Sequence, residues 1–82
     1  MDAVKKWAPI LITWDDSNGS AEWIEEQNVK HGPNRIVEVG LFIKRDRTGV
    51  TTCKAHDTTS NSVHGIAFIP KGNIVSVVEL KP

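Results

Sequence analysis

RIVEVGLFIKRD, residues Arg35–Asp46, is the segment around which the rest of the chain can be arranged. Its aliphatic residues at positions 37, 39, 41 and 43 fall on every second residue, so one face of a pleated strand is continuously apolar. Gly40 lies in the middle, where glycine predicts a bulge or a sharp bend. The short turn Asp46–Gly49 leads at once into a second β-rich run, Val50–His56. The segment therefore predicts a bent β-hairpin.

Three further segments have the composition of β-strands, and they are Ala8–Trp14, Val63–Pro70 and Ile74–Leu80. Gly65 predicts a bend inside the second of them. Pro70 followed by Gly72 predicts a tight turn of the 3₁₀ type before the last strand.

The segment between the first two strands begins with the polar turn cluster Asp15–Ser20. Gly19 or Ser20 can cap a short helix over Ala21–Gln27, in which the glutamates lie toward the N-terminal half. The only strong apolar anchors of this helix are Trp23 and Ile24. The sequence therefore predicts one brief helix after the first strand, followed by a loop over Asn28–Asn34.

Five short strands, one helix and one tight turn predict a mainly β fold, a small, strongly bent antiparallel barrel of the SH3-like or Sm-like kind. The OB-fold uses similar strands in a different order and stays open as an alternative. The tight turn between the last two strands favours the SH3-like arrangement.

The composition predicts one small domain over residues 1–82, with residues 1–7 as a loosely ordered leader. Ten basic residues balance ten acidic ones, which is not the strongly basic composition of a general nucleic-acid binder. The single cysteine, Cys53, excludes an internal disulfide and fits a reducing compartment. No secretory signal and no long apolar run is found, so we expect a cytoplasmic protein.

An ordered set of short motifs resembles a group of small bacteriophage proteins. The set consists of Ile12–Asp15, Trp23, Val39–Leu41, Ile69–Gly72, Ile74 and Leu80. The resemblance covers about residues 10–80. It implies a phage accessory protein on an SH3-like or Sm-like barrel, acting in the cytoplasm of an infected bacterium, and it implies no reaction. The acidic residue that this group carries near the end of its second strand is matched only loosely, by Asp46.

Catalytic and metal-binding chemistry has little support in the sequence. His56 and the hydroxyl-rich residues after it include Thr58 and Thr59, but their spacing imposes no catalytic triad. Three scattered histidines and one cysteine give no paired metal ligands. The loop that starts at Asp15 lacks the closing glutamate of a calcium site. We therefore expect no enzyme activity, no metal and no cofactor.

Two groups of residues are candidates for ligand binding. Trp14, Asp15, Asp16 and Trp23 predict an aromatic and acidic corner that stacks on a nucleobase and accepts from its amine. The alternative is that Trp14 plugs the end of the barrel and Trp23 fixes the helix onto it.

The second group is basic and lies at the tip of the central hairpin. It consists of Lys44, Arg45, Arg47 and Lys54, and it can hold phosphate through charge-assisted hydrogen bonds. The loop Asp57–Ser62, with His56, Thr58 and Thr59, adds a polar lip. The alternative is a solvated turn that protects a strand edge.

These observations predict a non-enzymatic binding module that forms a homo-oligomer and binds a nucleotide-like small molecule, with sequestration of host defence signals as its role. Two alternatives stay open. One is a nucleic-acid-binding regulator of the Sm or SH3-like kind, and the other is a protein-interaction or virion component that binds a host or structural partner.

Overall fold

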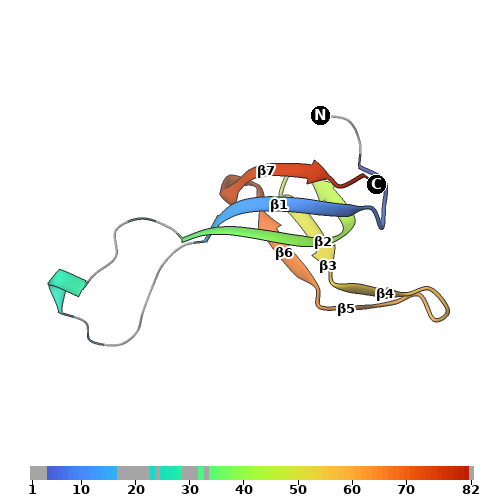
Figure 1. Ribbon diagram of the computed structural model, residues 1–82, viewed down its shortest axis with the longest axis horizontal. Helices are drawn as coiled ribbons and strands as arrows, with labels where there is room; N and C mark the ends of the chain where they lie inside the picture. Colours follow the sequence, from blue (N-terminus) through green and yellow to red (C-terminus); the bar gives the residue numbers. More distant parts are fainter. Residues whose placement is uncertain (1–3, 17–22, 24, 29–31, 33, 82) are drawn as a thin grey trace.

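The computed structural model describes residues 4–16, 23, 25–28, 32 and 34–81. Five antiparallel strands form one sheet, in the order β6-β3-β2-β1-β7, and two short strands form a hairpin beside it (Figure 1). The strands are β1 Pro9–Asp16, β2 Asn34–Asp46, β3 Gly49–Cys53, β4 Ala55–Asp57, β5 Ser62–His64, β6 Ala67–Pro70 and β7 Ile74–Glu79. Two 3₁₀ turns complete the described structure, η1 Glu26–Asn28 and η2 Lys71–Asn73. The prediction of a mainly β fold is confirmed.

The closed barrel and the helix after the first strand were predicted and are not found. Among the described strands, β6 and β7 end the sheet on its two sides without pairing with each other. Of the helix expected over Ala21–Gln27, residues 21, 22 and 24 lie outside the described residues, and the described part holds only the turn η1. Too few apolar anchors explain the missing helix, because short helices need tertiary packing to be stable.

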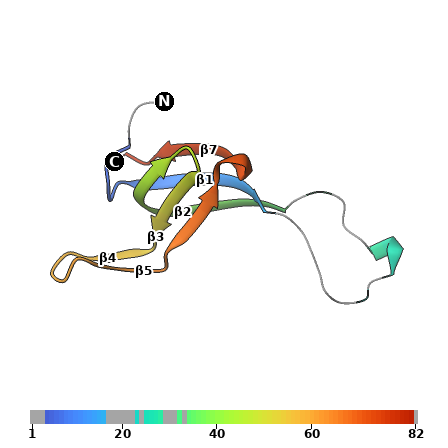
Figure 2. The same cartoon turned by 180° about the vertical axis from the view of Figure 1, so that it is seen from behind.

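Two of the predicted strands are interrupted at matching positions. Lys54 separates β3 from β4, and Gly65 and Ile66 separate β5 from β6, with a left-handed φ of 70° at Gly65. The Lys54 N–H donates to the His64 carbonyl oxygen at 2.9 Å, so both strands leave the main sheet together. The β4–β5 hairpin consequently projects from the sheet, as the view from behind also shows (Figure 2). The bend predicted at Gly65 is confirmed.

Of the bulge or sharp bend predicted at Gly40, the bulge is not found there. Gly40 pairs regularly with Ile10, and the register of β2 against β3 shifts further on, between Phe42 and Lys44. A Cβ on Gly40 would lie 3.2 Å from the Thr52 Cβ and 3.3 Å from the Cys53 carbonyl oxygen. Glycine is therefore used at this position for the close approach of two strands.

The hydrophobic core lies on one face of the sheet, which we call the inner face. Its buried members are Ile10, Ile12, Phe42, Val50 and Ile69, with Trp14, Ile74 and Val77 packed against them. The bend of β2 carries β3 and β6 over this face, so that Val50 and Ile69 meet the isoleucines of β1. The tight turn predicted at Pro70–Asn73 is present as η2, and it returns the chain so that β7 pairs with β1.

Candidate functional site

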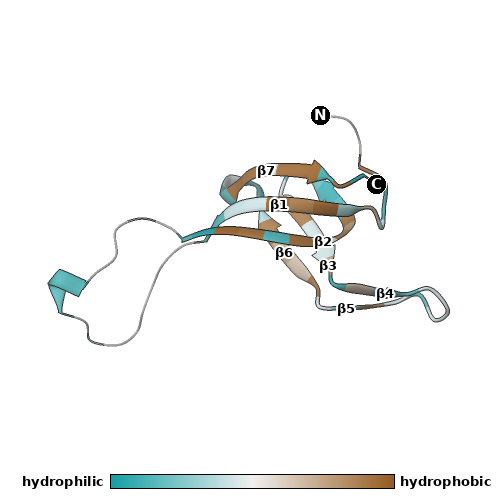
Figure 3. Cartoon of the chain, in the orientation of Figure 1, coloured by the Kyte–Doolittle hydropathy of each residue, from teal (hydrophilic) through white to brown (hydrophobic). Residues whose placement is uncertain are grey.

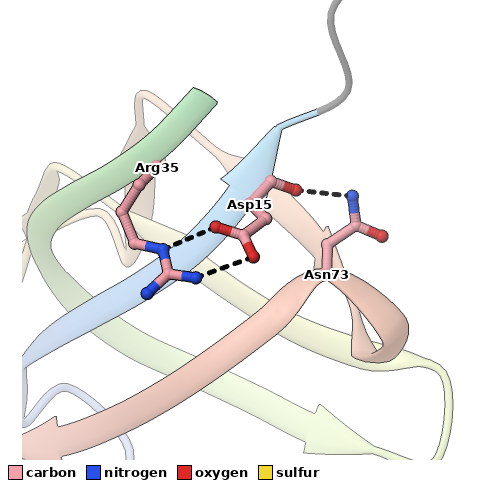
Figure 4. Close-up of polar contacts among 3 residues, drawn as sticks. All are labelled: Asp15, Arg35 and Asn73. Carbon is pink, nitrogen blue, oxygen red and sulfur yellow. Dashed lines mark hydrogen bonds and ion pairs between the residues drawn. The ribbon is translucent and has the colours of Figure 1, made fainter. Parts of the chain in front are cut away.

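The end of β1 carries a set of polar contacts that involves two strands and a turn (Figure 4). Arg35 donates to Asp15 through both Nε and a terminal nitrogen, at 2.6 Å and 3.0 Å. Asn73, at the end of η2, donates its amide to the Asp15 carbonyl oxygen at 2.8 Å. The hydrogen bonds from Arg35 hold the pKa of Asp15 below its ordinary value; desolvation opposes them, and the positive charge of Arg35 adds a smaller lowering. This corner joins β1, β2 and the turn before β7.

Trp14 and Asp15 lie on opposite faces of the sheet, because successive side chains of a strand alternate. The Trp14 indole is partly buried against the core, and its Nε1 donates to the Glu38 carboxylate at 2.8 Å. Asp16 is exposed at the end of β1, and Trp23 is fully exposed. The described structure therefore does not bring the two tryptophans and two aspartates together in one corner.

The hairpin tip between β2 and β3 holds the basic residues Lys44, Arg45 and Arg47, all exposed. The Lys44 ammonium lies 3.9 Å from Asp46, whose carboxylate accepts from the Thr48 hydroxyl and from the Thr48 N–H. These hydrogen bonds from Thr48, more than the charge of Lys44, lower the pKa of Asp46. Asp46 therefore organises the turn.

The base of the β4–β5 hairpin is an aromatic and polar cluster. The rings of Trp7 and His56 stack with centroids 3.5 Å apart and planes 6° from parallel, and the Lys6 ammonium lies 5.0 Å from the Trp7 ring centre. The second nitrogen of His56, Nε2, contacts the Asn61 side-chain oxygen at 2.8 Å. Trp7 has a φ of 73°, an uncommon conformation for a bulky residue, and its N–H donates to the Phe42 carbonyl oxygen.

The loop of this hairpin is built on Asp57. Its carboxylate accepts from the backbone N–H groups of Thr59 and Ser60, at 2.9 Å and 3.3 Å, and these bonds lower its pKa. Thr58 and Thr59 are exposed. The polar lip predicted here is thus an ordered turn at the end of the hairpin.

The predicted ligand-binding residues therefore fall into separate groups within one chain. Asp15 pairs with Arg35 at one end of β2, whereas Arg45 lies near the other end, about 30 Å away along the strand. Lys54, His56, Thr58 and Thr59 belong to the projecting hairpin. Trp7, which the ligand prediction did not include, is the aromatic residue that reaches His56.

A different surface, which the sequence did not single out as a binding site, is an apolar part of the described exterior. We call it the outer face, and it consists of Pro9, Leu11, Thr13, Val37, Val39, Leu41, Ser76 and Val78. These residues are adjacent across three strands: Leu11 lies between Val39 and Val78. Val37, Val39 and Val78 are 59%, 60% and 50% exposed. Figure 3 shows brown, apolar stretches along β1, β2 and β7, with more polar stretches between or beside them.

One end of the outer face is polar. The alternation of β1 and β2 places Asp15 and Arg35 on the same side as Leu11 and Val39, at one end of the face. An apolar centre with a polar rim is the arrangement found in protein interfaces. The sequence signal that could have found this face is the apolar character of both faces of β1, where Leu11 lies between two isoleucines.

Among residues 4–16, 23, 25–28, 32 and 34–81, no three histidine, cysteine or acidic side chains come together as a possible metal site. The described residues contain no helical segment with the length and apolar character that a membrane crossing requires. Comparisons with protein-family models, with curated proteins and with solved structures gave no match. The resemblance to small phage proteins stays a prediction.

Proposed function

We propose that this protein is a non-enzymatic protein-interaction module that acts through the outer face of its sheet. The observation that supports this proposal is the unbroken apolar surface formed by Leu11, Val39 and Val78, with Val37 beside it. Contiguous apolar patches on small proteins commonly mark interaction sites. This proposal corresponds to the second alternative from the sequence.

Burial of this face by a partner is energetically reasonable. Each valine still has half or more of its side chain in water, so covering one is worth about 1 kcal/mol at the usual value for apolar surface. The face interior has no charged side chain that would need a counter-charge. The partner therefore needs a flat apolar surface of its own.

The arrangement of strands supports an open relative of the SH3-like and Sm-like barrels. We infer this likeness from the strand order, in which consecutive strands pair and the last strand returns to the first. The fold by itself does not imply a function, so the proposal depends on the outer face and not on this likeness.

Photocrosslinking in bacterial cells tests the proposal. The photoreactive residue benzoylphenylalanine replaces Val39 in one variant and Ile66, which is 64% exposed but outside the outer face, in a control. We expect covalent adducts to protein at position 39 and few at position 66. Equal or absent adducts at the two positions would contradict the proposal.

Binding of a nucleotide-like small molecule is a second candidate function. The observation in its favour is the cluster of Trp7, His56 and Lys6 beside the hydroxyl-rich hairpin loop, because aromatic rings and an ammonium group suit a base and a phosphate. In an infected bacterium, such binding would sequester nucleotide signals.

Native mass spectrometry of the purified protein with a mixture of nucleotides tests this second function. We expect a nucleotide-sized mass gain that is lost in His56→Ala and kept in Trp23→Ala, since Trp23 is fully exposed and away from the cluster. No mass gain with the mixture would contradict it.

A further inference from the structure

We propose that the occupant of the outer face is a second copy of this chain, so that the protein forms an isologous, face-to-face dimer. The inference rests on the proposed interaction function and names its partner. It is supported by the charge of the chain and of the face, by the protection of the sheet edges, and by the size of the face.

The charge distribution permits self-association. Ten basic and ten acidic residues leave the chain with a net charge of zero, so two copies do not repel each other. The ionisable pair at the end of the face, Asp15 and Arg35, is already joined by two hydrogen bonds and needs no counter-charge from a partner. A twofold contact requires one patch to complement itself, which an uncharged aliphatic patch does.

The sheet edges are protected, whereas the face is not. The edge strand β6 is short and ends in Pro70, which has no N–H to offer. The other edge strand, β7, carries Glu79 opposite the buried Ile10, an inward-facing charge, and its register against β1 shifts beside Trp14. Short length, proline, inward charges and irregularities are the features by which proteins prevent edge pairing. Contact through the face is therefore favoured over growth of the sheet.

The geometry of a sheet face suits a second copy. Two sheets with the same twist pack about 10 Å apart with their strands about 30° from parallel, as in β-sandwiches. In such a packing Leu11 of each copy lies near the centre of the interface. Val39 and Val78, on the two sides of Leu11, interdigitate with the same residues of the other copy.

The size of the face sets the strength of the expected dimer. Three strands, and the length of β1 from Pro9 to Thr13, give a footprint of about 14 Å by 16 Å. The surface buried on both copies of the dimer, including the residues around each footprint, is therefore less than about 1,200 Å² in total. Interfaces of this size are usually weak. We therefore expect a dimer that forms and dissociates with concentration.

Analytical ultracentrifugation of the purified protein tests the inference. Over a range from about 5 µM to about 500 µM, we expect the average mass to rise from 9.1 kDa toward twice that value. Val39→Lys puts two charges into each dimer and should weaken association at least about 100-fold. The matched control Ile66→Lys, with similar exposure, should change it by less than about threefold. Circular dichroism melting checks that both variants fold, and Val78→Ser replaces Val39→Lys if that variant does not.

The outcomes separate this inference from the function on which it rests. A monomer over the whole range, or equal weakening by both lysine variants, overturns the dimer. If the protein is then still crosslinked at position 39 to a different protein, the interaction function stands with another partner. If it is monomeric and gives no adduct at position 39, both proposals fail.

Discussion

Both faces of β2 carry apolar side chains, but they lie in opposite environments. On the inner face Phe42 is 8% exposed, and Ile36 is partly buried together with the polar Glu38. On the outer face Val37 and Val39 remain mostly in water, although this is the face with the continuous aliphatic pattern. The difference shows that coverage by β3 and β6, rather than the hydrophobicity of β2 itself, determines which face becomes the core.

The comparison has a functional consequence. A face that is apolar and covered contributes to folding, whereas a face that is apolar and uncovered is available for association. Both halves of this statement can be tested by substitutions that remove side chains from one face at a time.

The largest expected difference is between Ile12→Ala on the inner face and Val37→Ala on the outer face. Ile12 is fully buried, so its truncation leaves a cavity and should lower the free energy of unfolding by about 3 kcal/mol. Val37 is mostly exposed, so its truncation should change that free energy by less than about 0.5 kcal/mol. Urea denaturation of dilute protein, where association is negligible, measures both. Similar losses for the two variants would show that the outer face is covered within one chain.

A smaller difference is expected between polar contacts on the two faces. Glu38→Ala removes the acceptor of the partly buried Trp14 Nε1 and should lower the free energy of unfolding by about 1 kcal/mol. Arg35→Ala removes an exposed ion pair on the outer side and should lower the free energy of unfolding less than Glu38→Ala does, and this smaller effect should weaken as salt is added. Urea denaturation with Glu38→Gln as control checks the cause, since glutamine keeps an acceptor oxygen. A larger loss of unfolding free energy in Arg35→Ala than in Glu38→Ala would contradict this prediction.

The smallest expected effect is the dependence of stability on pH. The pKa values of Asp15, Asp46 and Asp57 lie below 3.8 in the folded protein because their carboxylates accept hydrogen bonds. The unfolded chain therefore binds more protons than the folded protein in acid. The stability that these three carboxylates contribute is fully present above about pH 5, and it is lost as the pH falls through their pKa values in the folded protein. Thermal melting between pH 7 and pH 2.5 measures this loss. In Asp57→Asn the melting temperature should fall less steeply as the pH is lowered, because one of the three carboxylates has been removed. A profile identical to that of the unchanged protein would show that Asp57 does not contribute to the loss of stability in acid.

Much of the local structure follows from the sequence. The alternation in Arg35–Asp46, the bend at Gly65 and the turn after Pro70 were predicted from residue types, because each depends on neighbours along the chain. The helix predicted over Ala21–Gln27 is not found in the described part of that segment, which holds only the turn η1. A short helix needs tertiary packing to be stable, and local propensity cannot supply that packing.

The candidate site was less predictable than the fold. His56, Thr58 and Thr59 are close in sequence and stay together on the β4–β5 hairpin. Trp14 and Asp15 are adjacent in sequence but point to opposite faces, and Trp7 reaches His56 from a distant part of the chain. Spacing along the chain cannot predict such contacts, because the register between strands sets them.

The sequence by itself determined that this protein is built from short strands, where those strands turn, and that its charges balance. Only the tertiary structure decided which apolar face is covered and which is left open. The physical reason is that the side chains of a pleated strand alternate between two faces, both of which carry apolar residues in β1 and β2, and the bend that brings Val50 and Ile69 against Ile10 and Ile12 can cover only one of them.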